Sequence, residues 1–270
     1  MRKNLLWICM SALVVLSCNT KSSSSKSDDE EETRELKTKV FKYEKNTSHA
    51  EASISIEFPV GGDEELGNSI YDFIVETMKE QQAYEDDLDD YRNDGQGFVD
   101  LFGKKISSDL EEGWENYTQG DESMEDVLNE NIKYSIVDNN DKYVTYLYEY
   151  DNYYGGDGYM NRVGATFLKD DCSRVTNDFL FKDPSSEKLL TLVVNELKKK
   201  YCEGEYAFLG EEELDGIEEL PQASFYITKD GLAFSYHMYE VHWASLEGVL
   251  PWNKVEKLLT DEAKELIDED

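Results

Sequence analysis

The sequence predicts an α+β fold in which antiparallel sheets pack against helices. Segments with alternating apolar and polar residues occur in runs, and helical segments interrupt these runs without the regular β-α alternation of a doubly wound sheet. The middle of the chain is rich in tyrosine and β-branched residues, which favour strands. With 270 residues, 39% of them hydrophobic, the chain has enough apolar material for one or two packed domains.

The first region, residues 36–129, is expected to form two strands followed by two helices. Residues 36–44 and 51–58 alternate apolar and polar side chains, as half-buried strands do. A pair of glycines ends this pattern, and Asp63 can then cap the first helix. The apolar residues with helical spacing are Leu66, Ile70, Phe73, Ile74 and Met78 in the first helix, and Phe98, Leu101, Phe102, Ile106, Leu110 and Trp114 in the second.

The second region, residues 130–270, is expected to begin with an antiparallel meander of three strands at 132–137, 143–150 and 159–168. Two turn-forming segments, Asp-Asn-Asn-Asp and Gly-Gly-Asp-Gly, separate these strands.

A helix, an acidic loop and a hairpin are predicted after the meander. Asp183 and Pro184 are expected to open the helix as its cap and first-turn residue. The later segments are an acidic loop at 204–220, a hairpin formed by 225–228 and 232–239, and a helical segment at 251–259.

The charge of the chain favours cationic partners. It contains 60 acidic and 27 basic residues, for a formal net charge of -33. A field of this sign repels phosphate backbones and anionic headgroups, so binding to nucleic acid or to the surface of acidic membranes is disfavoured. The sequence also contains no Gly-rich phosphate loop and no G-x-S-x-G motif.

The N-terminus has the features of a secretory signal. Two basic residues precede an apolar run from Leu5 to Leu16 that is too short to span a bilayer comfortably. The sequence Val-Leu-Ser-Cys that ends at Cys18 resembles a bacterial lipobox. Residues 1–17 are therefore expected to be a lipoprotein signal peptide and Cys18 to carry the lipid, with an ordinary cleaved signal as the alternative.

The segment that follows the lipobox is expected to be a tether. Residues 18–35 are acidic and lack the side chains that form a core, so they are predicted to be disordered. The protein is then expected in the cell envelope, either periplasmic or surface-exposed, with the lipid as its only attachment to the membrane.

Two cysteines of the second region, Cys172 and Cys202, allow two interpretations. In an oxidising compartment they could form a disulfide across one helix, which would contribute roughly 3 kcal/mol. The alternative is two free buried thiols, because spacing alone does not bring the sulfur atoms together.

Tyrosines crowd the meander and provide candidate contact residues. Tyr146, Tyr148 and Tyr150 share one strand face, which could be either an inner sheet face or a recognition platform. The turn at 151–158 lacks the spacing of a calcium-binding loop, so a hairpin tip is favoured. The candidate contact residues around it are Tyr153, Tyr154, Asp157 and Tyr159.

The sequence predicts neither a metal site nor an enzyme, and no cofactor is expected. His237, Glu240 and His242 have suitable side chains for a metal, but on a straight strand His237 would face away from the other two. Paired carboxylates, as in glycoside hydrolases, cannot be singled out among 60 acids.

The C-terminal third shows a pattern that resembles a known family. Residues 225–234 read FYITKDGLAF, Tyr239-Glu240-Val241 follows, and Gly248 precedes Val-Leu-Pro. This pattern is similar to the domain of unknown function shared by RsiV anti-sigma factors and PdaC-type peptidoglycan deacetylases, and the resemblance extends over residues 130–260. Tyr239 and Glu240 resemble the signature pair, in which Tyr239 is expected to pack and Glu240 to accept hydrogen bonds at a strand end.

The resemblance implies an extracytoplasmic α+β binding module, which in the anti-sigma relatives captures lysozyme. The sequence lacks their sigma-binding, transmembrane and deacetylase segments, so signalling and deacetylation are not expected. We therefore expect a lipid-anchored protein that recognises a cationic protein such as lysozyme, or peptidoglycan, with Tyr239 and Glu240 among its contact residues. The alternatives are a carboxylate-dependent wall hydrolase, an accessory of a deacetylase, or a structural lipoprotein.

Overall fold

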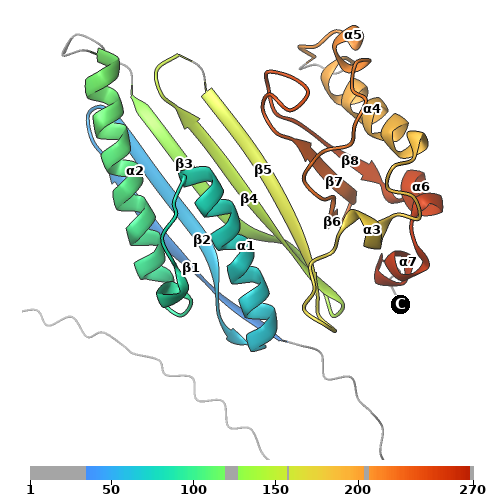
Figure 1. Cartoon of the computed structure of the whole chain (residues 1–270), viewed down its shortest axis with the longest axis horizontal. Helices are drawn as coiled ribbons and strands as arrows, with labels where there is room; N and C mark the ends of the chain where they lie inside the picture. The colour runs from blue at the N-terminus through green and yellow to red at the C-terminus, as the bar shows by residue number, and fades with distance from the viewer. Residues whose placement is uncertain (1–34, 119–126, 157, 204–206, 268–270) are drawn as a thin grey trace, which may run out of the picture. The chain divides into compact units, whose positions relative to one another are not determined.

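A computed structural model describes residues 35–118, 127–156, 158–203 and 207–267. The expected signal peptide, Cys18, nearly all of the tether and Asp157 lie outside these ranges. Two mostly antiparallel sheets pack against helices (Figure 1), which confirms the predicted α+β class. None of the helices in these ranges combines the length and apolar character that a bilayer span requires.

The first sheet has five strands in the order β1-β2-β3-β4-β5 and draws on both sequence regions. Its neighbours are antiparallel except for β2 and β3, which are parallel. A parallel pair needs a crossover connection, and two helices supply it here. The elements are β1 (Leu36–Asn46), β2 (Ala50–Gly62), α1 (Glu64–Gln82), η1 (Asp89–Tyr91), α2 (Gly95–Thr118), β3 (Leu128–Asn139), β4 (Tyr143–Tyr153) and β5 (Gly158–Leu168).

The two helices cover one face of this sheet and form the first hydrophobic cluster with it (Figure 1). Asp63 caps α1 as predicted, because its Oδ1 accepts a hydrogen bond of 2.9 Å from the Leu66 backbone N–H. Tyr146, Tyr148 and Tyr150 are 0%, 1% and 4% exposed in this cluster. They therefore form an inner sheet face, and the alternative of a recognition platform is wrong.

A glycine on α2 lets the helix approach the first strand closely. A Cβ atom on Gly103 would lie 2.2 Å from the ring of Tyr43. The Tyr43 hydroxyl is 3.0 Å from the Ser107 hydroxyl one turn further along α2. The missing side chain thus lets an aromatic ring of β1 lie flat against the helix.

The remaining elements form a second hydrophobic cluster around a three-stranded sheet in the order β6-β7-β8. The predicted hairpin is present as β6 and β7, and the short strand implied by the family resemblance is β8. The elements are α3 (Asn177–Leu180), α4 (Glu187–Tyr201), α5 (Glu211–Leu214), β6 (Tyr226–Thr228), β7 (Gly231–Tyr236), β8 (Leu246–Pro251), α6 (Trp252–Val255), η2 (Glu256–Leu258) and α7 (Asp261–Ile267).

Two boundaries in this part differ from the prediction. Helix α4 does not open at Asp183 and Pro184, because the Asp183 carboxylate accepts hydrogen bonds from the backbone N–H and hydroxyl of Ser185 in a separate turn. Ser186 caps the helix instead, accepting from the Leu189 N–H at 3.2 Å. Strand β7 ends at Tyr236 and not at residue 239, since the chain turns there.

The disulfide considered from the sequence is not formed. No bond joins the sulfur atoms of Cys172 and Cys202. Cys172 is buried in the first hydrophobic cluster, whereas Cys202 is half-buried at the end of α4 against the second. The two thiols therefore pack in different cores, and Cys202 is less buried than expected.

Charged side chains connect the two sheets. Arg162 on β5 donates two hydrogen bonds, of 2.8 and 2.7 Å, to the carboxylate of Glu247 on β8, and a third of 2.9 Å to Glu149 on β4. Lys200 on α4 also donates to Glu247, at 2.9 Å. Burial raises the pKa of Glu247, but the hydrogen bonds from Lys200 and Arg162 outweigh it and hold this pKa below its ordinary value.

Candidate binding site

A tight turn after β7 holds the predicted Tyr239-Glu240 pair. The Glu240 carboxylate accepts hydrogen bonds of 2.8 Å from the backbone N–H groups of His237 and Gln222, which confirms its expected role at a strand end. Tyr239 has a left-handed backbone, with φ of 65°, and its N–H donates to the His242 carbonyl at 2.7 Å.

Tyr239 was expected to pack, and this expectation is wrong. Because β7 already ends at Tyr236, Tyr239 lies on the turn and is 73% exposed. Trp243 follows on the same segment and is 61% exposed, and its ring centroid is 6.3 Å from that of Phe208, which is 51% exposed. We call these three exposed residues, Phe208, Tyr239 and Trp243, the aromatic patch: the rings of Phe208 and Trp243 are in contact, and Tyr239 lies on the same turn segment as Trp243.

A run of carboxylates lies against this patch. The acidic segment, residues 211–219, contains six acidic residues and no basic one. Glu213 Oε1 is 3.5 Å from His242 Nε2, beside Trp243. The Tyr236 hydroxyl donates to the Glu219 carbonyl at 2.7 Å, which ties the end of the segment to β7. The aromatic patch thus has a negatively charged border.

Most of this negative charge is not neutralised within the fold. Lys198 pairs with Asp215 and lies 4.0 Å from Glu211. Glu213 contacts His242. In the part of the chain that the structure describes, the remaining exposed carboxylates of the segment form no ion pair with a basic side chain. They belong to Glu212, Glu218 and Glu219.

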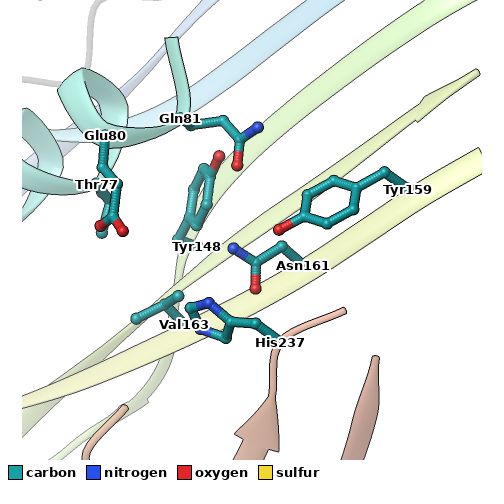
Figure 2. A pocket seen from close by; sticks show the side chains of 8 residues that line it. All are labelled: Thr77, Glu80, Gln81, Tyr148, Tyr159, Asn161, Val163 and His237. Carbon is teal, nitrogen blue, oxygen red and sulfur yellow. The ribbon is translucent and has the colours of Figure 1, made fainter. Parts of the chain in front are cut away.

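His237 extends from the same turn into a pocket of about 220 Å³ (Figure 2). We call it the α1–β5 pocket, since α1, β4 and β5 supply its other walls. Three buried polar atoms of its lining have no hydrogen-bond partner among the described residues, namely Tyr148 Oη, Asn161 Oδ1 and His237 Nε2. Buried polar groups are rarely left unpaired, so this clustering needs an explanation. The lining residues are Thr77, Glu80, Gln81, Tyr148, Tyr159, Asn161, Val163 and His237.

The lining of the α1–β5 pocket contains no lysine or arginine. Its one carboxylate belongs to Glu80, an exposed residue of α1. Burial, and then the nearby charge of Glu80, raise the pKa of Tyr159. Burial also raises the pKa of Tyr148. Both phenols are therefore neutral at physiological pH, and the pocket can accept hydrogen bonds from a ligand that carries donors.

The structure separates the predicted contact residues into different places. Tyr159 lines the α1–β5 pocket, whereas Tyr239 and Glu240 lie on the turn beside the acidic segment. Tyr154 is half-buried, and its hydroxyl donates a hydrogen bond of 2.7 Å to the buried carboxylate of Glu130. Tyr153 is half-buried at the end of β4.

His237, Glu240 and His242 do not form a metal site in this structure. Among the described residues, no group of three or more histidine, cysteine, aspartate or glutamate side chains is placed to hold a metal ion. Glu240 is occupied by backbone N–H groups, and His242 Nδ1 accepts a hydrogen bond of 3.1 Å from the Ala244 N–H. The three side chains therefore make separate contacts: Glu240 with backbone N–H groups, His242 with Ala244, and His237 with the α1–β5 pocket.

Sequence reasoning missed Phe208, Trp243 and Asn161 as site residues. A signal for the first two was present, because large aromatic residues stand in or beside loops rich in acids and turn formers. Asn161 gave no signal, since its place in the pocket beside Tyr148 depends on how α1 packs on the edge strand.

A larger hollow of about 550 Å³ lies near the turn between β3 and β4, bordered by Lys229 and Trp252. Its polar groups are satisfied locally. The Tyr143 hydroxyl donates to Asp138 at 3.0 Å, and Asn140 Oδ1 accepts from two backbone N–H groups at 2.9 Å. We therefore consider the α1–β5 pocket and the aromatic patch the stronger candidates.

The fold places the protein in a class of α+β proteins with a five-stranded mixed sheet, a crossover of two helices and a smaller three-stranded sheet. No protein-family model matches the chain, and no curated protein matches it. Two solved structures of the DUF3298 family have a similar fold. The one from Bacteroides fragilis has a TM-score of 0.58 at 18% identity, over 88% of this chain and 99% of that chain. The one from Pseudomonas aeruginosa has a TM-score of 0.57 at 11% identity, over 86% and 97%.

Proposed function

We propose that the protein is a lipid-anchored binding protein of the cell envelope, attached through Cys18, that recognises a cationic protein such as lysozyme. The observation that supports this proposal is the aromatic patch bordered by the acidic segment. Exposed aromatic side chains of this size are typical anchors of protein interfaces. A neighbouring group of free carboxylates selects a partner of positive charge.

The two parts of this surface contribute differently to binding. The rings of Trp243 and Tyr239 can bury apolar area and receive a lysine or arginine of the partner over their faces. The acidic segment acts at longer range, because its field attracts the partner before contact and is screened by salt. Affinity should therefore depend mainly on the aromatic patch, and the association rate on the acidic segment.

Titration of the mature chain with hen lysozyme, followed by calorimetry at low and high salt, tests this proposal. The change Trp243→Ala should lower the affinity by about 2 kcal/mol, or about thirtyfold, as expected for an interface anchor. The triple change Glu212→Gln, Glu218→Gln and Glu219→Gln removes the unpaired carboxylates of the acidic segment and should slow association, measured by stopped-flow mixing, and weaken its salt dependence. A matched control removes three exposed acids far along the chain, with Glu85→Gln, Asp86→Asn and Asp90→Asn.

Equal effects of the two triple changes would contradict the proposal, because they would show that only the net charge matters. Absence of lysozyme binding at low salt would contradict it as well. Retention on insoluble peptidoglycan that resists salt and is lost with Trp243→Ala would instead favour the cell-wall glycan, since aromatic faces can also stack on sugar rings.

A further inference from the structure

We propose that the α1–β5 pocket binds a primary ammonium group on an aliphatic stem, either a lysine side chain of the bound protein or a free amine. This inference rests on the proposed function only where the ammonium belongs to a protein partner. The pocket itself is defined by the unpartnered polar atoms of Tyr148, Asn161 and His237.

The three unpartnered atoms come from the neighbouring strands β4 and β5 and from the distant turn after β7, and they meet at one cavity (Figure 2). Tyr148 on β4 is 1% exposed and Asn161 on β5 is 6% exposed. The figure shows the Asn161 amide between the rings of Tyr148 and Tyr159, with His237 below it. A buried donor or acceptor without a partner destabilises the fold, so a ligand that pairs several of these atoms gains binding energy.

The types of these atoms favour a ligand with several hydrogen-bond donors. Asn161 Oδ1 is only an acceptor, the phenol of Tyr148 can accept, and His237 Nε2 accepts when the proton is on Nδ1. An ammonium group offers three donors and no acceptor, which suits this set. An anion would meet the amide oxygen and the Glu80 carboxylate without a lysine or arginine to balance them.

The walls also suit an aliphatic stem and a positive charge. Val163 supplies an apolar surface, along which the methylene groups of a lysine can pack. The exposed Glu80 provides the negative charge that a partly buried ammonium requires. A volume of about 220 Å³ is below the 300–1,000 Å³ range of drug-sized ligand sites and fits a small group.

Two model compounds test the chemistry of the pocket directly. N-acetyl-lysine methylamide and N-acetyl-norleucine methylamide share the aliphatic stem, but only the first carries an ammonium group. Titration of the ¹⁵N-labelled protein should show saturable shifts of the Asn161 and His237 signals with the lysine compound alone. Equal shifts with both compounds, or no shifts, would overturn the proposal.

A pair of tyrosine variants provides the matched control. Tyr146 and Tyr148 are both buried on β4 with unpartnered hydroxyls, but only Tyr148 lines the pocket. Tyr148→Phe should weaken binding of the lysine compound about tenfold or more, whereas Tyr146→Phe should leave it unchanged. Neither change should lower the unfolding temperature, because each removes an unpaired buried hydroxyl. Equal losses of binding in the two variants would refute the assignment.

The same variants separate this proposal from the proposed function. If lysozyme fails to bind but the lysine compound binds, the pocket assignment stands and the lysozyme proposal fails. If lysozyme binds wild type and Tyr148→Phe equally and the lysine compound does not bind, the pocket assignment fails alone. If the lysine compound binds while Tyr148→Phe leaves lysozyme affinity unchanged, the ligand is a free amine and not a side chain of the partner.

Discussion

The hydrogen bond from Tyr154 to Glu130 indicates that Tyr154, a candidate contact residue in the sequence, stabilises the fold. Glu130 is 3% exposed, and its carboxylate accepts from the Tyr154 hydroxyl at 2.7 Å and from the Gln82 amide. A hydrogen bond to a charged group contributes about 1.5–3 kcal/mol. Because Tyr154 is half-buried and water can partly replace it, we expect Tyr154→Phe to cost about 2 kcal/mol, near the lower end of that range.

The pH dependence of this loss has a definite sign. Burial raises the pKa of Glu130 although the hydrogen bonds from Tyr154 and Gln82 oppose this effect. A carboxyl group with a raised folded-state pKa favours folding most at low pH, and that contribution is lost as the pH rises through the folded-state pKa. Tyr154→Phe raises this pKa further. The difference in stability between wild type and variant should therefore be full above the pKa of Glu130 in both proteins and shrink as the pH falls through it.

Urea unfolding of wild type, Tyr154→Phe, Glu130→Gln and the double variant measures the coupling. We expect a coupling energy of about 1–2 kcal/mol between the two sites and an unfolding temperature for Tyr154→Phe lower by about 4–8 °C. Lysozyme affinity should be unchanged in Tyr154→Phe. Additive losses in the double variant, or a loss that stays constant with pH, would refute the reasoning.

Two further predictions concern the junction of the sheets. A Cβ atom on Gly164 would lie 2.2 Å from the ring of Tyr226, so Gly164→Ala should destabilise the protein by about 1–3 kcal/mol through overpacking; Gly216→Ala, with open space around it, is the control in the same urea assay. Because the pKa of Glu247 is lower in the folded protein than in the unfolded chain, its ionised carboxylate stabilises the fold when the pH is above the unfolded-state pKa. This contribution is lost as the pH falls below about 4.5. Glu247→Gln should therefore flatten the acid limb of the stability curve, and an unchanged limb would exclude this carboxyl.

Local signals in the sequence predicted much of the fold. Alternation identified the strands of the meander and of β1 and β2, and Asp63 marked the start of α1, because these features depend on neighbours in the chain. The start of α4 was predicted too early because Asp183 and Ser186 are both good caps. Only the structure shows that Asp183 is engaged with Ser185.

The candidate site was less predictable, since it depends on contacts between distant segments. Tyr146 and Tyr148 occupy equivalent positions of one alternating strand, and the sequence gives no reason to prefer either for the pocket. Tyr239 was expected to pack as part of the signature pair of the family it resembles, and the strand was expected to reach it. Once the strand ends at Tyr236, the same residue lies on an exposed turn.

The parallel pairing of β2 with β3 has a consequence for the order of folding. The β1–β2 hairpin joins residues close together in the chain, but its free edge pairs with β3 only across residues 63–127. Pairing over such a separation is slow compared with hairpin formation. An open edge is a site for pairing with other chains. A folding intermediate that contains the β1–β2 hairpin but not yet β3 should therefore be the species most prone to aggregation.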